Sequence, residues 1–224
     1  MGFNKLALAL LIAASIVVSP YEINGTYCNI QAEEINSQHE INKVLVLANT
    51  SRRYYAESTS TTLIDGVYSE SQEQIWTDVQ SGRTYTKQSS HGKTSHHYIN
   101  GGELITYNEG EKTYQKMLTK PSPQNSLLKA YEQGELLFVE DVKVNSWDTM
   151  HFIRKGKSTN LQHIWLDKKT GIVVKLLLVS ESSFWSTTFT KIDSNSIFSD
   201  KKFIFIVPPH VKVETISPEE IKID

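Results

Sequence analysis

A series of short polar segments, each closed by a glycine-containing turn, most strongly constrains how this chain can fold. The segments lie between residues 54 and 118 and are rich in Ser, Thr and Tyr, which favour pleated strands. Asp65-Gly66 is a strong signal for a two-residue hairpin. Strands joined by short turns pair antiparallel with their sequence neighbours, so we expect a six-strand antiparallel meander. Its remaining turns are expected at Ser81-Gly82, His91-Gly92, Gly101-Gly102 and Glu109-Gly110.

The second half of the chain predicts more strands and a helix. Pro121 and Pro123 stop the meander, because proline cannot serve in a central strand. A short helix is expected at 125–133. Further strands are expected at 136–144, 147–154, 161–167, 172–179, 184–192 and 203–207.

An amphipathic helix is expected at 33–53, where Ile41, Val44, Leu45 and Ala48 share one face. The predicted fold is therefore mainly β with two short lid helices (α+β). A sheet of about 11–12 strands must twist and curl, so we expect a curved antiparallel sheet that forms a half-open β-barrel.

The most apolar segment is the predicted hairpin at 164–179, "IWLDKKTGIVVKLLLV". Its second strand offers apolar groups to both faces, which is typical of a strand that is covered on both sides. We expect the hairpin to form the wall of a concave apolar cavity under the two helices; the alternative is the core of a sandwich. The expected lining residues are Leu45, Trp76, Trp165, Val173, Leu176, Leu178, Phe184 and Phe189.

The N-terminus has the pattern of an export signal. The run Leu6 to Val18 is apolar or small but shorter than the roughly 20 residues that span a bilayer, and Ser19-Pro20 ends it. We expect residues 1–32 to be a signal peptide, with cleavage after Ala32, and residues 33–224 to form a single domain. Cys28, the only cysteine, matches a lipoprotein signal poorly. The predicted location is the periplasm or the outer face of the cytoplasmic membrane.

The composition argues against several kinds of function. A formal net charge of −2 gives no basic excess for nucleic acid. His91, His96 and His97 suggest a metal site, but consecutive strand residues point to opposite faces, so we expect no metal. The sequence holds no G-x-S-x-G motif and no phosphate-binding loop. We therefore predict a binding protein with no cofactor and no enzymatic activity; the less favoured alternative is an uncharacterised hydrolase.

An aromatic residue recurs in each of the last five strands of the expected meander. The residues are Trp76, Tyr85, Tyr98, Tyr107 and Tyr114. Such a row can stabilise cross-strand pairs as an aromatic ladder, or it can line a pocket or an interface. We favour the ladder.

The order of these parts resembles the LolA-like family, which includes outer-membrane lipoprotein carriers and envelope sensors that regulate sigma factors. The resemblance rests on the motif Trp165-x-Asp167-x-x-Thr170-Gly171 with Lys175, supported by "YYAESTSTTL", "ELITYNEGEKTYQKM" and "FIFIVPPHVKVE". It implies an apolar cavity that holds the acyl chain of a lipid or lipoprotein. Alternatively, it implies a module that docks an envelope protein partner, such as a cell-wall amidase or a sensor, without lipid transport.

Overall fold

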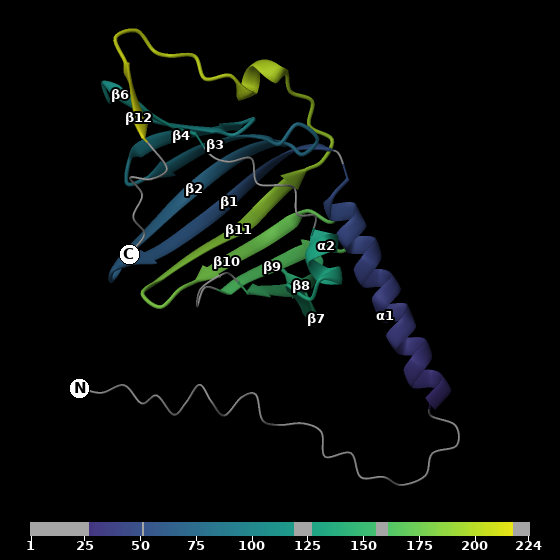
Figure 1. Ribbon diagram of the computed structural model, residues 1–224. Coiled ribbons are helices and arrows are strands. Elements are labelled where there is room, and N and C mark those ends of the chain that lie inside the picture. The colour runs from purple at the N-terminus through teal and green to yellow at the C-terminus, as the bar shows by residue number, and fades with distance from the viewer. Residues whose placement is uncertain (1–26, 51, 119–126, 156–160, 217–224) are drawn as a thin grey trace, which may run out of the picture. The chain divides into compact units, whose positions relative to one another are not determined.

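The computed structural model describes residues 27–50, 52–118, 127–155 and 161–216 (Figure 1). Most of the expected signal peptide lies outside these residues. The chain divides into two units, residues 1–38 and 39–224, and the first is described only as the beginning of a helix. No helix within the described ranges is long and apolar enough to cross a membrane.

The second unit holds the twelve strands of the protein's sheet. In chain order the elements are α1 (Tyr27–Ala48), β1 (Arg53–Ile64), β2 (Val67–Asp78), β3 (Arg83–Ser90), β4 (Lys93–Asn100), β5 (Glu103–Asn108), β6 (Thr113–Leu118), α2 (Leu127–Glu132), β7 (Leu136–Val144), β8 (Trp147–Lys155), β9 (Leu161–Asp167), β10 (Val173–Val179), β11 (Ser183–Asp193), the 3₁₀ helix η1 (Asp200–Phe203) and β12 (Lys212–Ile216).

All twelve strands belong to one open, curved sheet (Figure 1). Their order is β12-β6-β5-β4-β3-β2-β1-β11-β10-β9-β8-β7, so β12 and β7 form its two edges. The six-strand meander is confirmed. At its first turn Asp65 and Gly66 both have positive φ, 50° and 78°, as a type I′ hairpin requires. The expected half-open curved sheet is also confirmed.

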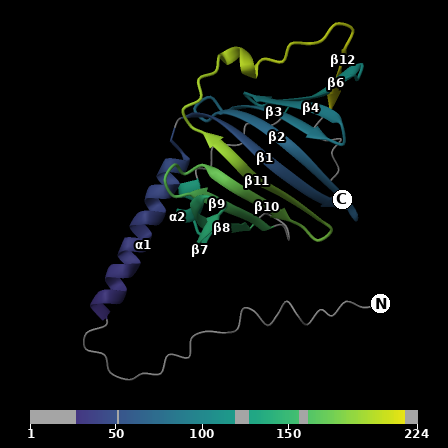
Figure 2. The ribbon, with the colours of Figure 1, turned by 180° about the vertical axis from the view of Figure 1, so that it is seen from behind.

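The end of the chain differs from the prediction. The expected strand at 203–207 is wrong, and the last strand is β12, which pairs parallel with β6. Phe203 is buried, and the Phe205 ring lies 4.9 Å from the ring of Tyr114. These side chains hold the segment against the sheet, and Figure 2 shows it passing along the outside near β3 and β4. After β11 the chain thereby reaches the distant edge of the sheet, where β12 runs parallel to β6.

Helix α1 also differs from the prediction, because it runs from Tyr27 to Ala48 rather than over 33–53, and it is not short. The apolar spacing identified its packing face correctly. Ile41, Val44 and Leu45 are buried in a core with Ala130 of α2. The strand residues of this core come from β7, β8 and β9: Leu136, Met150, Phe152, Ile164 and Leu166. Residues 39–48 and α2 therefore cover the β7–β9 part of the sheet.

Candidate ligand-binding site

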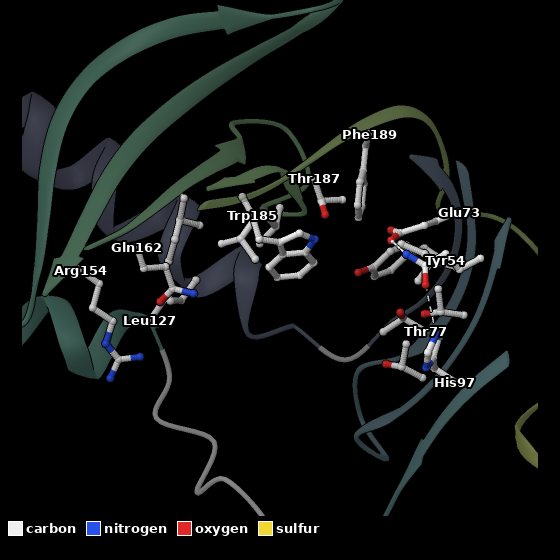
Figure 3. Close-up of a pocket in the computed structure, with 17 residues that line it drawn as sticks. Tyr54, Glu73, Thr77, His97, Leu127, Arg154, Gln162, Trp185, Thr187 and Phe189 are labelled. Carbon is white, nitrogen blue, oxygen red and sulfur yellow. Dashed lines mark hydrogen bonds between the residues drawn. The ribbon is translucent and has the colours of Figure 1, made fainter. Parts of the chain in front are cut away.

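A cavity of about 640 Å³ lies on the inner face of the sheet (Figure 3). This volume is within the range of about 300–1,000 Å³ that is usual for small-molecule sites. Its lining comprises Tyr54, Glu73, Ile75, Thr77, Thr84, Thr86, Gln88 and His97 from β1–β4, with Leu127, Arg154, Gln162, Ile164, Val173, Leu176, Trp185, Thr187 and Phe189 from the second half of the chain. The polar meander and the apolar hairpin thus both line the cavity.

One wall of the cavity is apolar and comes mainly from β10 and β11. Successive side chains of a strand alternate between faces, so Trp185 and Phe189 of β11 both face inward. Val173 and Leu176 of β10 are three residues apart, and a register irregularity between Val173 and Lys175 allows both to line the same cavity. Both also contact the core beneath α1. This wall is continuous with the hydrophobic core.

The opposite wall is polar and comes from β1–β4. Figure 3 shows Trp185 between the Leu127 side of the cavity and a side that holds Tyr54, Glu73 and His97. Burial raises the pKa of the Tyr54 phenol, although a hydrogen bond with Thr77 opposes this shift. Glu73 Oε2 accepts a 2.9 Å hydrogen bond from Ser58. The cavity therefore presents an apolar surface and a hydrogen-bonding surface to the same space.

His97 belongs to this polar wall as a neutral imidazole. Its Nε2 lies 3.2 Å from the side-chain amide oxygen of Gln88, Oε1. This oxygen can only accept a hydrogen bond, so Nε2 carries the proton. Its Nδ1 then accepts from the Thr106 hydroxyl at 3.2 Å. Burial, together with the nearby His96, lowers the pKa of His97. No positive charge is therefore expected on this ring at neutral pH.

The structure brings together three of the eight residues expected to line the cavity: Val173, Leu176 and Phe189. Leu45 is fully buried in the core under α1 instead. Leu178 lies near the end of β10, is 36% exposed and is not part of the lining.

Trp76, Trp165 and Phe184 point to the outer face. Each adjoins a residue that lines the cavity, and adjacent strand residues diverge. For Phe184 that neighbour is Trp185, which the sequence reasoning missed. The alternation in "SFWSTTF" was the available signal, but it does not say which of the two aromatic residues faces inward.

The Trp165–Gly171 motif has structural roles. Asp167 Oδ2 accepts from the Thr170 backbone N–H at 2.9 Å and from the Thr170 hydroxyl at 2.5 Å. Gly171 has a φ of 68° and lies against the end of α1, where an added Cβ would be only 2.4 Å from the Ala48 nitrogen. The motif therefore stabilises the β9–β10 turn and lets the end of α1 pack directly against it.

Arg52 also stabilises the contact between the end of α1 and the β9–β10 turn. Its Nη1 donates to the carbonyl oxygens of Leu47 and Thr170, at 2.6 Å each. Burial lowers the pKa of this guanidinium. Arg52 thus links the end of α1 to the β9–β10 turn.

The aromatic row of the meander is a ladder on the outer face. The Trp76 ring stacks on Tyr85 at 5.1 Å, and Tyr85 stacks on Tyr98 at 4.6 Å. Phe205 covers the Tyr98 end, and Lys202 Nζ lies 3.8 Å from the Trp76 ring centroid. The expectation of a ladder, rather than a pocket, is confirmed.

The histidines of the meander point to opposite faces, as predicted. His96 stacks beside Tyr85 on the outer face, whereas His97 lines the cavity. Within the described ranges, no group of three or more His, Cys, Asp or Glu side chains is placed to hold a metal ion.

A wide, open, curved sheet with helices packed on part of its inner face defines the class of protein. The architecture is the half-open, curved sheet with packed helices that the sequence predicted.

Among solved structures, an uncharacterized conserved protein from Thermus thermophilus is similar to this chain. The TM-score is 0.56 at 10% identity, over 81% of this chain and 99% of that one. This likeness supports the fold alone.

Two more distant structures have lower scores. The MucA/MucB complex of Pseudomonas aeruginosa gives a TM-score of 0.47 at 14% identity, over 81% of this chain and 64% of that one. A LolA superfamily protein from Nitrosomonas europaea gives 0.39 at 9% identity, over 75% and 97%. Both differ too much from this chain to bear on its function. No protein family model matches the sequence, and no curated protein matches it either.

Proposed function

We propose that this protein is an exported, non-catalytic binding protein of the cell envelope that holds an acyl chain of a lipid or lipoprotein. The observation that carries the proposal is the apolar wall of the cavity. Trp185, Val173 and Leu176 face a space of about 640 Å³ that no side chain of the described residues fills. Apolar surface in contact with water costs about 25 cal/mol per Å² relative to burial, so an apolar ligand there is stabilised. The apolar run Leu6 to Val18 supports export.

Native mass spectrometry of the protein, expressed as the full chain in a bacterial host, tests this proposal. We expect a lipid adduct that solvent extraction removes. Leu176→Asp places a charge in the apolar wall and should abolish the adduct. Leu137→Asp is the matched control, because Leu137 is a 56% exposed leucine of the edge strand β7, outside the cavity.

Circular dichroism establishes that both variants keep their strand content. A wild-type protein that carries no lipid, and that takes up neither fatty acid nor lipopeptide offered in excess, would contradict the proposal. So would equal loss of the adduct in the two variants.

A second candidate function is the binding of an envelope protein partner, such as a cell-wall amidase or a sensor. It is favoured by β7, which lies at an edge of the sheet with Leu137 and Val139 exposed by 56% and 45%. An exposed apolar edge strand can accept a strand from another chain. A photo-crosslinking residue at Val139 tests this candidate: a discrete partner should be captured there, with none captured from Glu70, an exposed position on the distant strand β2.

A further inference from the structure

The polar wall of the cavity contains a carboxylate whose charge is poorly compensated. Glu73 is only 8% exposed and lines the cavity. Its Oε2 accepts one good hydrogen bond, from Ser58 at 2.9 Å, and Gln88 Nε2 lies 3.4 Å from its Oε1. A carboxylate can accept about four hydrogen bonds. In the parts of the chain that the structure describes, no Lys, Arg or His forms an ion pair with it. A buried charge without a partner is costly, so this site favours a ligand that supplies one.

Among the residues that the structure describes, the neighbours of Glu73 supply neutral polar groups but no positive charge. Gln88 pairs with Glu73 across β2 and β3. Its Nε2 donates a 2.8 Å hydrogen bond to Ser71 Oγ, and its Oε1 accepts a 3.2 Å hydrogen bond from His97 Nε2. His97 is neutral, as its hydrogen bonds and its lowered pKa both indicate. Arg154, which is the cation among the described lining residues, lies on the far side of Trp185 and pairs with Glu135 at 3.2 Å (Figure 3). As far as the described residues go, the polar end of the cavity is therefore negative.

We propose that this cavity selects amphiphiles with a cationic ammonium headgroup, and that the Glu73 carboxylate binds the ammonium. The alkyl chain then lies along Trp185 and Leu176, while the ammonium donates to the free lone pairs of Glu73. A phosphate or carboxylate headgroup in the same place would meet a like charge in a partly buried site, where repulsion is strong. The inference rests on the proposed function, because it assigns the headgroup of the ligand whose chain the apolar wall holds.

The test compares three ligands with the same alkyl chain: hexadecylamine, hexadecanol and hexadecanoic acid. Equilibrium dialysis of radiolabelled ligand at submicellar concentrations, at neutral pH, measures each dissociation constant for the full-length protein. We expect the amine to bind about tenfold more tightly than the alcohol, which corresponds to about 1.4 kcal/mol. The acid should bind more weakly than the alcohol. Glu73→Gln should abolish the preference for the amine over the alcohol.

Glu70→Gln is the matched control variant. Glu70 lies on the same strand, is exposed on the outer face, and should keep the preference for the amine when neutralised. Equal binding of amine and alcohol by the wild-type protein would overturn the inference, even if Glu73→Gln does not fold, and would leave the proposed function standing. A preference that survives in folded Glu73→Gln would also overturn the role of Glu73. Failure of all three ligands to bind would overturn the proposed function itself.

Discussion

Replacement of Gly171 by alanine tests whether the end of α1 must sit directly on the β9–β10 turn. Gly171 has a φ of 68°, which side chains other than glycine rarely adopt. An added Cβ would lie 2.4 Å from the Ala48 nitrogen, 2.6 Å from the Leu47 carbonyl carbon and 2.8 Å from the Leu47 Cβ. Two of these three atoms are backbone, so the helix itself would have to move.

Two terms contribute to the expected loss of stability. A non-glycine residue in the left-handed region costs about 1–2 kcal/mol, and forcing an extra carbon into a packed contact costs about 1–3 kcal/mol more. Together they predict that Gly171→Ala lowers the free energy of unfolding by about 2–5 kcal/mol. Gly66→Ala isolates the first term, because Gly66 has a φ of 78° and open space where its Cβ would lie.

Urea unfolding of the two variants separates the terms. With a slope of about 2 kcal/mol per molar urea, the expected extra cost of about 1–3 kcal/mol at Gly171 lowers the midpoint by about 0.5–1.5 M relative to Gly66→Ala. The slope should stay unchanged. Equal midpoints for the two variants would refute the reasoning, because the close approach of Leu47 and Ala48 would then cost nothing.

Two further predictions concern charged and titratable side chains. Arg52→Met removes the hydrogen bonds to the carbonyls of Leu47 and Thr170 and should lower the free energy of unfolding by about 2–3 kcal/mol, since bonds from charged donors are strong; urea unfolding checks this, and an unchanged midpoint would contradict it. His151 and His163 are 3.0 Å apart, Nε2 to Nδ1, and burial lowers the pKa of both, with their mutual repulsion lowering that of His151 further. Because the folded-state pKa values lie below the ordinary value of about 6.5, the unfolded chain takes up protons first, so stability should fall as the pH drops below about 6.5. His163→Gln should reduce this pH dependence of the urea midpoint, and a wild-type midpoint that is higher at about pH 5 than at about pH 7 would contradict the assignment.

Local chemistry made much of the fold predictable. The turn pair Asp65-Gly66 takes the conformation that its residue types favour, and each strand of the meander pairs with its sequence neighbour. The spacing of Ile41, Val44 and Leu45 identified the buried face of α1, although not its ends. The Trp165–Gly171 motif marked a turn with the expected side-chain to backbone hydrogen bonds. Each of these features depends on residues close in sequence.

The position of the last strand could not be read in this way. Phe205 does not belong to a strand and packs on the aromatic ladder instead. Strand β12, near the end of the chain, pairs with β6. Both outcomes depend on partners far away in sequence.

The sequence by itself determined that the chain forms a wide antiparallel sheet, with a polar first half and an apolar hairpin in the second. Only the tertiary structure decided which side chains face the cavity. A shift of one residue moves a side chain to the other face of a sheet, so Trp185 lines the cavity while Trp76 and Trp165 lie outside it. The irregularity after Val173 changes this alternation within β10. Because the curled sheet brings β2 opposite β10 and β11, Glu73 comes to share a cavity with the apolar hairpin, and no local pattern encodes that meeting.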